Sequence, residues 1–237
     1  MIAHRGRRAL AALTAGAALV LAAGCSGTHQ TTPDATHLDG LFRIAPGACP
    51  AASGLPTGSY LVVLSAASGG TVGNPHGGCK NPAYTLLDPG TDGGLVTGEF
   101  QQVSGPTFDR HGNSRDGRII APVRFGKLDV GFGTSSRDEQ DAPAGAPAFP
   151  VPSAIVRGSA LSVDLRSLVV SYAGDADTSC KTTYGVGCWE LGSENATGTY
   201  DAATGHYSIQ WFSGASFTPK GDSIEVHLEG TFVPSSS

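Results

Sequence analysis

Asp175 and Asp177 stand two residues apart in the stretch GDADTSC, where their carboxylates could hold a cation. Hard cations such as calcium prefer clusters of oxygen ligands of this kind. An EF-hand loop that began at Asp175 would need a glycine where this chain has Cys180, so that type of calcium loop is excluded. Two interpretations remain: a calcium site of another type, completed by Glu190 or Glu194, and a solvated turn without a metal. No other cofactor is expected.

His227 lies between Glu225 and Glu229 at a spacing of two residues, so that the three side chains share one face of a strand. Such a set could bind a metal or relay protons. We favour the simpler interpretation of a solvent-facing charged face. Charged side chains on an exposed strand also discourage pairing between sheet edges.

Aromatic residues are concentrated in the C-terminal part of the chain: Tyr184, Trp189, Tyr200, Tyr207, Trp211, Phe212 and Phe217. Tyr207 and Trp211 alternate with polar residues and share a face with Ile209, which predicts that they belong to a core. Tyr184 and Trp189 lie in or beside a short segment between two cysteines. We therefore expect these two to be the ligand-binding aromatics, able to form a platform for a sugar ring or an apolar ligand.

The first 24 residues have the three parts of a secretory signal peptide. The segment MIAHRGRR carries positive charge, an apolar run of 16 residues follows it, and Ala22, Ala23 and Gly24 supply the small residues at which a peptidase cleaves. As a helix, such a run spans about 24 Å, less than the roughly 30 Å of a membrane core. The sequence therefore predicts an exported protein rather than a membrane-spanning helix.

Cys25 directly follows these small residues, and the motif LAAGC resembles the lipobox of bacterial lipoproteins. In that family the cysteine receives a diacylglycerol thioether and becomes the first residue of the mature protein. The resemblance covers residues 1–25 alone. It implies lipidation of Cys25 and anchoring to the outer face of the bacterial cell membrane. Two or more acyl chains bury enough methylene groups, at about 0.8 kcal/mol each, to make such an anchor stable.

Four further cysteines, Cys49, Cys79, Cys180 and Cys188, form an even set. In an exported protein such a set predicts two disulfides, for which three pairings exist. We favour Cys180 with Cys188, which closes a short glycine-rich loop, and hence Cys49 with Cys79. Zinc binding is not expected, because zinc sites use close pairs such as Cys-x-x-Cys and this chain has none.

The net charge of the chain limits the classes of partner that it can bind. Three of the 15 basic residues, Arg5, Arg7 and Arg8, precede Cys25, which leaves 12 basic against 20 acidic residues in the remainder. This excess of negative charge argues against nucleic acid as a partner, because phosphate binding requires a basic surface. The predicted partners are the membrane, through the lipid anchor, and an envelope ligand or protein of unknown identity.

Past residue 40 the apolar residues recur with a period of two, which is the pattern of half-buried strands. In the last such run Ile224, Val226, Leu228 and Phe232 fall on one face. Similar runs lie within 59–66, 117–125, 127–132, 161–170 and 206–212. Turns rich in glycine and proline separate them, in a chain with 34 Gly and 15 Pro. The sequence therefore predicts an all-β fold, an antiparallel sandwich or barrel with long Gly/Pro-rich loops, preceded by the signal helix.

The expected organisation is a signal peptide at residues 1–24, a lipid-anchored flexible tether at 25–40 and an all-β domain at 41–237. Residues 135–152, polar and then rich in proline and alanine, form the alternative boundary between two small β domains. We favour one domain, because the part before this stretch holds too few clear strands to close a core.

Sequence motifs of common catalytic sites are absent, among them the G-x-S-x-G elbow, H-E-x-x-H, the P-loop and the dinucleotide fingerprint. The preferred interpretation is a cell-envelope lipoprotein with a non-catalytic binding role and an unknown ligand, an inference from fold class and missing motifs. Two alternatives remain: an envelope hydrolase whose catalytic residues are scattered along the chain, and a structural or assembly lipoprotein.

Overall fold

The computed structural model describes residues 34–50, 54–102, 117–126, 128–136, 148–172, 181–182, 185–186, 188–191, 195–215 and 222–236. Residues 33–237 form one compact unit. Every regular element in the described part of the chain is a β-strand, so these residues hold no helix that could cross a membrane. The prediction of an all-β fold is confirmed.

The strands are β1 (Ala35–His37), β2 (Gly40–Ile44), β3 (Tyr60–Leu64), β4 (Thr71–Val72), β5 (Thr85–Leu86), β6 (Gly94–Val96), β7 (Ile120–Phe125), β8 (Leu128–Thr134), β9 (Ser153–Arg157), β10 (Ala160–Asp164), β11 (Leu168–Tyr172), β12 (Lys181–Thr182), β13 (Gly185–Val186), β14 (Cys188–Leu191), β15 (Ala196–Tyr200), β16 (His206–Ala215) and β17 (Asp222–Pro234). They form an antiparallel sheet of 11 strands, a second sheet of four strands and a two-stranded ribbon.

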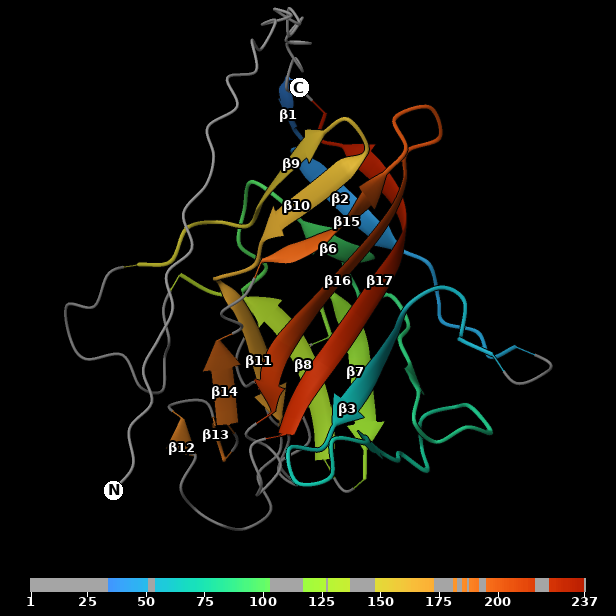
Figure 1. Cartoon of the computed structure of the whole chain (residues 1–237). Coiled ribbons are helices and arrows are strands. Elements are labelled where there is room, and N and C mark those ends of the chain that lie inside the picture. The colour runs from blue at the N-terminus through green and yellow to red at the C-terminus, as the bar shows by residue number, and fades with distance from the viewer. Residues whose placement is uncertain are drawn as a thin grey trace, which may run out of the picture. The chain divides into compact units, whose positions relative to one another are not determined.

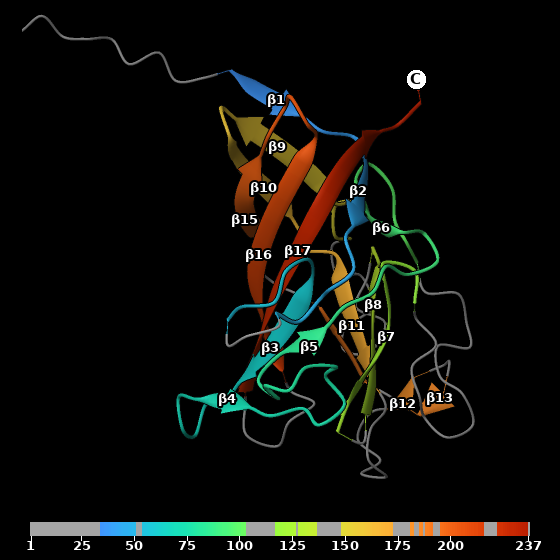
Figure 2. The same ribbon diagram turned by 90° about the vertical axis from the view of Figure 1, so that its right-hand side faces the viewer.

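The large sheet runs in the order β1-β9-β10-β15-β16-β17-β2-β6, with β3, β4 and β5 attached through β17, and it curls into a half-barrel (Figures 1 and 2). Its longest strand is β17, whose residues 223–227 pair with β3 and whose residues 230–234 pair with β2. β9 and β10 form a hairpin closed by Gly158 and Ser159, where the positive φ of 63° at Gly158 suits a tight two-residue turn. The second sheet runs β14-β11-β8-β7.

Both sheets contribute to one hydrophobic core, as the alternating pattern predicts. On β17, Ile224, Val226 and Leu228 are at most 1% exposed. Phe132 on β8 and Val170 on β11 bring the four-stranded sheet into the same buried cluster. Tyr207, Ile209 and Trp211 of β16 belong to the same core, and because side chains alternate between the two faces of a strand, the residues that lie between these core positions on β16 and β17 point away from it.

The apolar run at 161–170, expected as one strand, is divided between the two sheets. β10 ends at Asp164, whose carboxylate accepts a hydrogen bond from the Arg166 backbone at 3.1 Å. The Leu168 N–H then donates to the Leu165 carbonyl at 2.9 Å, and β11 begins. A side chain that bonds the backbone two residues on is a turn signal, and it overrides the continuous apolar pattern here.

The expected tether boundary at residue 40 is wrong. β1 pairs antiparallel with β9, Thr36 opposite Val156, and all three β1 side chains are exposed. Leu38 is only 8% exposed, and its N–H donates to the Ala154 carbonyl at 3.0 Å. A strand held by main-chain hydrogen bonds needs no apolar side chains, so β1 leaves no periodic pattern in the sequence. Of the alternative boundary at 135–152, residues 137–147 lie outside the described part of the chain.

Candidate functional site

Several predicted site residues lie outside the described residues: Cys25, Asp175, Asp177, Cys180 and Tyr184. The backbones of Cys188 and Trp189 belong to β14 and pair with Tyr172 and Ser171 of β11, but their side chains are not among those described. Lipidation of Cys25, the calcium site, the second disulfide and the aromatic platform therefore stay predictions.

The predicted pairing of Cys49 with Cys79 is confirmed, with the two Cα atoms 5.7 Å apart. This disulfide closes a segment of 30 residues that contains β3 and β4. Asn74 fixes the same segment from inside, because its side-chain amide donates to Thr85 Oγ1 at 2.9 Å and to the Arg124 carbonyl at 2.8 Å. The loop that carries Tyr84 is thereby held against β3.

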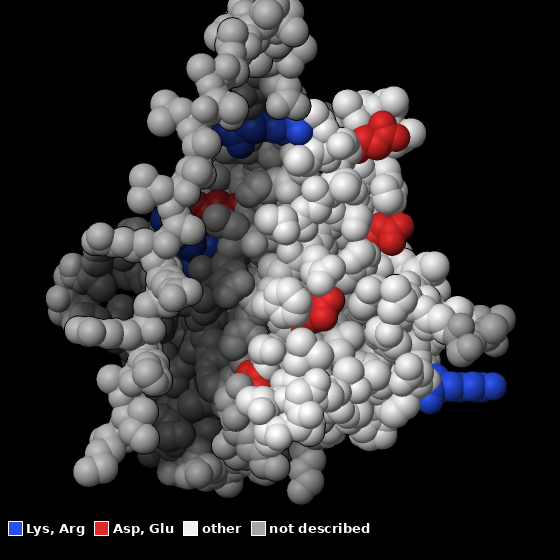
Figure 3. Space-filling model, viewed as in Figure 1, with Lys and Arg blue, Asp and Glu red and all other residues white. Residues whose placement is uncertain are grey.

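Polar and aromatic side chains gather on the face of β3, β16 and β17 that points away from the core. We call them the outer-face cluster: His206, Gln210, Phe212, Glu225, His227, Glu229, Tyr60 and Tyr84. The face seen in Figure 3 is mostly uncharged, with single acidic residues spread over it. Strand register places the members side by side, since His227 lies opposite Gln210 on one flank and Tyr60 on the other.

Three rings of the cluster pack together around Tyr60. The imidazole of His227 stacks on Tyr60 with ring centroids 4.8 Å apart and an interplanar angle of 23°. Tyr84 contacts Tyr60 edge to face, with ring centroids 5.5 Å apart. Burial, and after it the charge of Glu225, raises the pKa of the Tyr60 hydroxyl. The hydroxyl therefore stays protonated and can donate a hydrogen bond.

The hydrogen-bonding groups of the cluster are paired with one another. The Gln210 amide donates to Glu225 Oε1 at 2.5 Å. His206 Nε2 lies 3.1 Å from Glu229 Oε1, and His227 Nε2 lies 3.7 Å from Glu229 Oε2. Both carboxylates therefore have a side-chain partner on this face.

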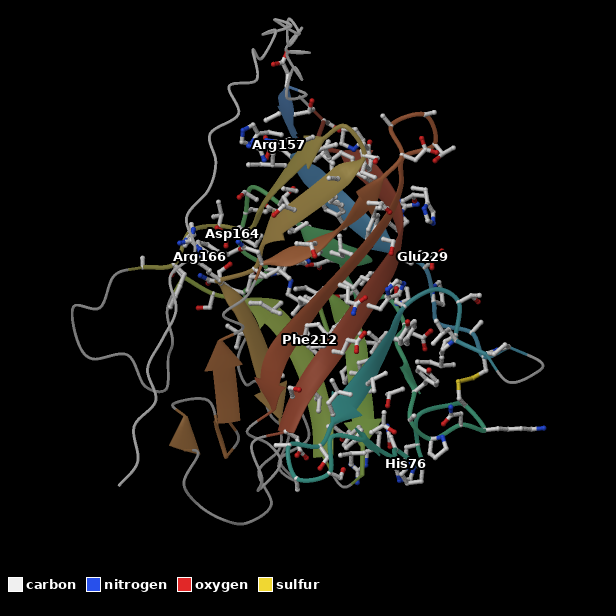
Figure 4. The ribbon with its side chains drawn as sticks, viewed as in Figure 1. His76, Arg157, Asp164, Arg166, Phe212 and Glu229 are labelled. Carbon is white, nitrogen blue, oxygen red and sulfur yellow. A yellow bond between two sulfur atoms is a disulfide. The ribbon has the colours of Figure 1, made fainter. Side chains whose placement is uncertain are left out.

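Phe212 is the most exposed phenylalanine or tyrosine ring of the cluster, with 42% of its surface exposed. It lies directly opposite Glu225 in the pairing of β16 with β17, and Figure 4 shows it on β16 below Glu229. An exposed aromatic ring beside a fixed amide and carboxylate offers an apolar surface flanked by hydrogen-bonding groups.

The environment of Glu225, His227 and Glu229 differs from the one that the sequence predicts. β17 is a central strand, paired with β16 on one side and with β2 and β3 on the other, so protection of a sheet edge is the wrong explanation. All three residues are half-buried and partnered. Among the described residues no group of three or more His, Cys, Asp or Glu is placed to hold a metal ion.

Sequence reasoning named Phe212 among the aromatics but missed Tyr60, Tyr84 and Gln210 as site residues. Tyr60 opens an alternating apolar run, and nothing in that run points to His227, which is 167 positions further along the chain. Only the pairing of β3 with β17 brings the two rings together.

Comparison with models of protein families, with curated proteins and with solved structures finds no match to this chain.

Proposed function

We propose that the protein is a cell-envelope lipoprotein, held by acyl chains on Cys25 at the outer face of a bacterial cell membrane, whose β-domain binds an envelope carbohydrate without catalysis. The observation that carries the proposal is the exposed Phe212 ring beside the Gln210–Glu225 pair. The C–H face of a sugar ring packs on an aromatic ring, and its hydroxyls bond to amides and carboxylates.

The rigidity of the sheet supports this role. β16 and β17 are paired over ten residues of each strand. The pair Phe212–Glu225 lies within this run, so backbone hydrogen bonds hold the two strands together before and after it. Gln210 is already bound to Glu225, which limits the side-chain freedom that a ligand must remove. A preorganised surface of this kind favours binding of a polar ligand.

The anchor is supported by the lipobox-like motif and by the distance along the chain. Asp34, the first described residue, follows Cys25 by only nine positions, a separation that spans at most about 32 Å when fully extended. A domain tethered in this way stays close to the polysaccharides at the membrane surface. Mass spectrometry of the mature N-terminus should find Cys25 carrying two or more acyl chains, and an unmodified Cys25 would contradict the anchor.

The binding role is tested by titrating the mature protein, in detergent, with peptidoglycan fragments and with oligosaccharides released from envelope polysaccharides. We expect one of these probes to bind, and Phe212→Ala to weaken that binding at least tenfold. Val233→Ala is the matched control, since Val233 is 38% exposed on the same strand as Glu225 and lies outside the cluster. Binding should then change less than twofold.

Absence of binding to every probe, or equal affinity in the wild type and Phe212→Ala, would overturn the carbohydrate proposal. Turnover of a bound oligosaccharide would support the hydrolase alternative instead.

A further inference from the structure

The two edge strands of the large sheet, β6 and β1, differ in whether the backbone groups of their outer edge are hydrogen-bonded. At one end β6 pairs with β2 and with no other described strand, and the side chain of Gln101 covers its other edge. Gln101 Oε1 accepts from the Val96 N–H at 2.8 Å, and its Nε2 donates to the Gly94 carbonyl at 2.8 Å. Gln101 is fully buried. Its amide thus takes the place of a neighbouring strand and closes this edge.

At the other end β1 pairs with β9, and no other described strand pairs with its far edge (Figures 1 and 2). The bond from the Leu38 N–H to Ala154 sets the alternation, so that Thr36 also points its main-chain groups towards β9. Ala35 and His37 point theirs away. Within the described part of the chain no main-chain group bonds to that outward edge.

We propose that this edge pairs with the β1 strand of a second copy of the chain, antiparallel and about a two-fold axis. The two Thr36 residues then meet at the axis, and each Ala35 faces His37 of the partner subunit. Four N–H···O bonds form, two in each of these pairs. The two large sheets become one continuous sheet.

A second copy is the occupant that the strand itself favours. An antiparallel edge is complementary to itself under two-fold symmetry, so no different sequence is required. Residues 35–37 are Ala, Thr and His, without the Lys or Pro that commonly protects an edge strand from pairing. The contrast with the closed β6 edge shows that this fold does contain a device for blocking an edge, and β1 lacks it.

The inference rests on the proposed lipid anchor. Four main-chain bonds by themselves hold a pair together only at about millimolar concentration. Anchors at Cys25, ten residues before Ala35, confine β1 of every copy to a thin layer above the bilayer and raise its local concentration. Dimers are therefore expected on membranes and monomers in dilute detergent.

The test uses the full lipidated protein in lipid vesicles. Thr36→Cys places one thiol on each side of the axis, in a non-hydrogen-bonded pair whose Cβ atoms lie about 5 Å apart. Mild oxidation should then yield at least tenfold more disulfide-linked dimer than Thr199→Cys, an equally exposed threonine on β15. Adding His37→Pro should abolish the dimer, because it removes an outward N–H and leaves the bonds to β9 intact.

Flotation of the same vesicles separates two failures. If the protein floats and Thr36→Cys gives no more dimer than Thr199→Cys, the pairing is overturned while the anchor stands. If the protein does not float, the anchor is overturned and the pairing with it. A Thr36→Cys adduct in intact cells whose mass differs from that of a dimer would show that another protein supplies the strand, which also overturns the second copy.

Discussion

On the inner face of β16 and β17, Tyr207, Ile209 and Leu228 are at most 1% exposed, whereas on the outer face Phe212 is 42% exposed and Glu229 is half-buried. The two faces share one backbone and differ only in which residues alternate onto them. Burying an apolar side chain contributes about 1.5–3 kcal/mol to stability, while an exposed ion pair contributes about 0–1 kcal/mol. The inner face therefore sets most of the stability of the domain, and the outer face contributes little to it.

The largest difference between the two faces should appear when two adjacent residues, Leu228 and Glu229, are replaced in turn. Leu228→Ala removes a side chain from the core, so we expect the free energy of unfolding to fall by about 3 kcal/mol. Glu229→Gln, one position along, keeps the size of the side chain and changes only the carboxylate contacts with His206 and His227. We expect it to change stability by less than about 1 kcal/mol. Urea unfolding measures both, and equal losses would show that the faces are not energetically distinct.

Two tyrosines extend the comparison to alkaline pH. Tyr207 is buried and its Oη donates to the Phe42 carbonyl at 3.2 Å, so Tyr207→Phe should cost about 1 kcal/mol at neutral pH. Burial raises the pKa of Tyr207 strongly and that of Tyr60 less. Because the folded state holds both hydroxyls in the protonated form, their contribution to stability is fully present below the ordinary tyrosine pKa of about 10. This contribution is lost as the pH rises through the raised pKa values of the folded state.

Stability measured from pH 8 to pH 12 should therefore fall above about pH 10 in the wild type. Tyr207→Phe should flatten this fall more than Tyr60→Phe does, because Tyr207 is the more deeply buried of the two. A larger effect from Tyr60→Phe would mean that the outer face governs the alkaline transition.

The smallest expected effect concerns the indole of Trp211, whose buried Nε1 has no hydrogen-bond partner among the described residues. Trp211→Phe removes that unpaired donor and leaves a small void, two changes of opposite sign. We expect a net change in unfolding free energy within about 1 kcal/mol. Phe212→Leu, the neighbour on the outer face, serves as the control for a ring lost outside the core. A loss above about 2 kcal/mol for Trp211→Phe would show that the indole N–H is bonded in solution.

Much of the inner face was predictable. Period-two patterns identify β17 and β16 and assign Ile224, Val226, Tyr207 and Trp211 to the core, because burial of one face leaves a repeating signal in the sequence. The same reasoning failed at β1, where the side chains are exposed, and at the turn after Asp164, where the apolar pattern runs on through a change of sheet. In both places hydrogen bonds, not burial, define the structure.

The outer-face cluster was less accessible to sequence reasoning. Glu225, His227 and Glu229 share a strand, so their common face is local information. Their contacts with Tyr60 and with Gln210 depend on which strands flank β17, and many strand orders satisfy the same alternation. The edge-protection hypothesis failed for this reason, since the sequence does not say whether a strand is central or peripheral.

By itself the sequence determined the all-β class and the inward faces of the long strands, since these follow from local periodicity. Tertiary structure alone decided that His227 stacks on Tyr60 and that β6 and β1 lie at the two ends of the large sheet. Each of these depends on residues far apart in the chain, whose meeting is set by sheet order and register. The alternation of residues within one strand does not indicate which strand pairs with it.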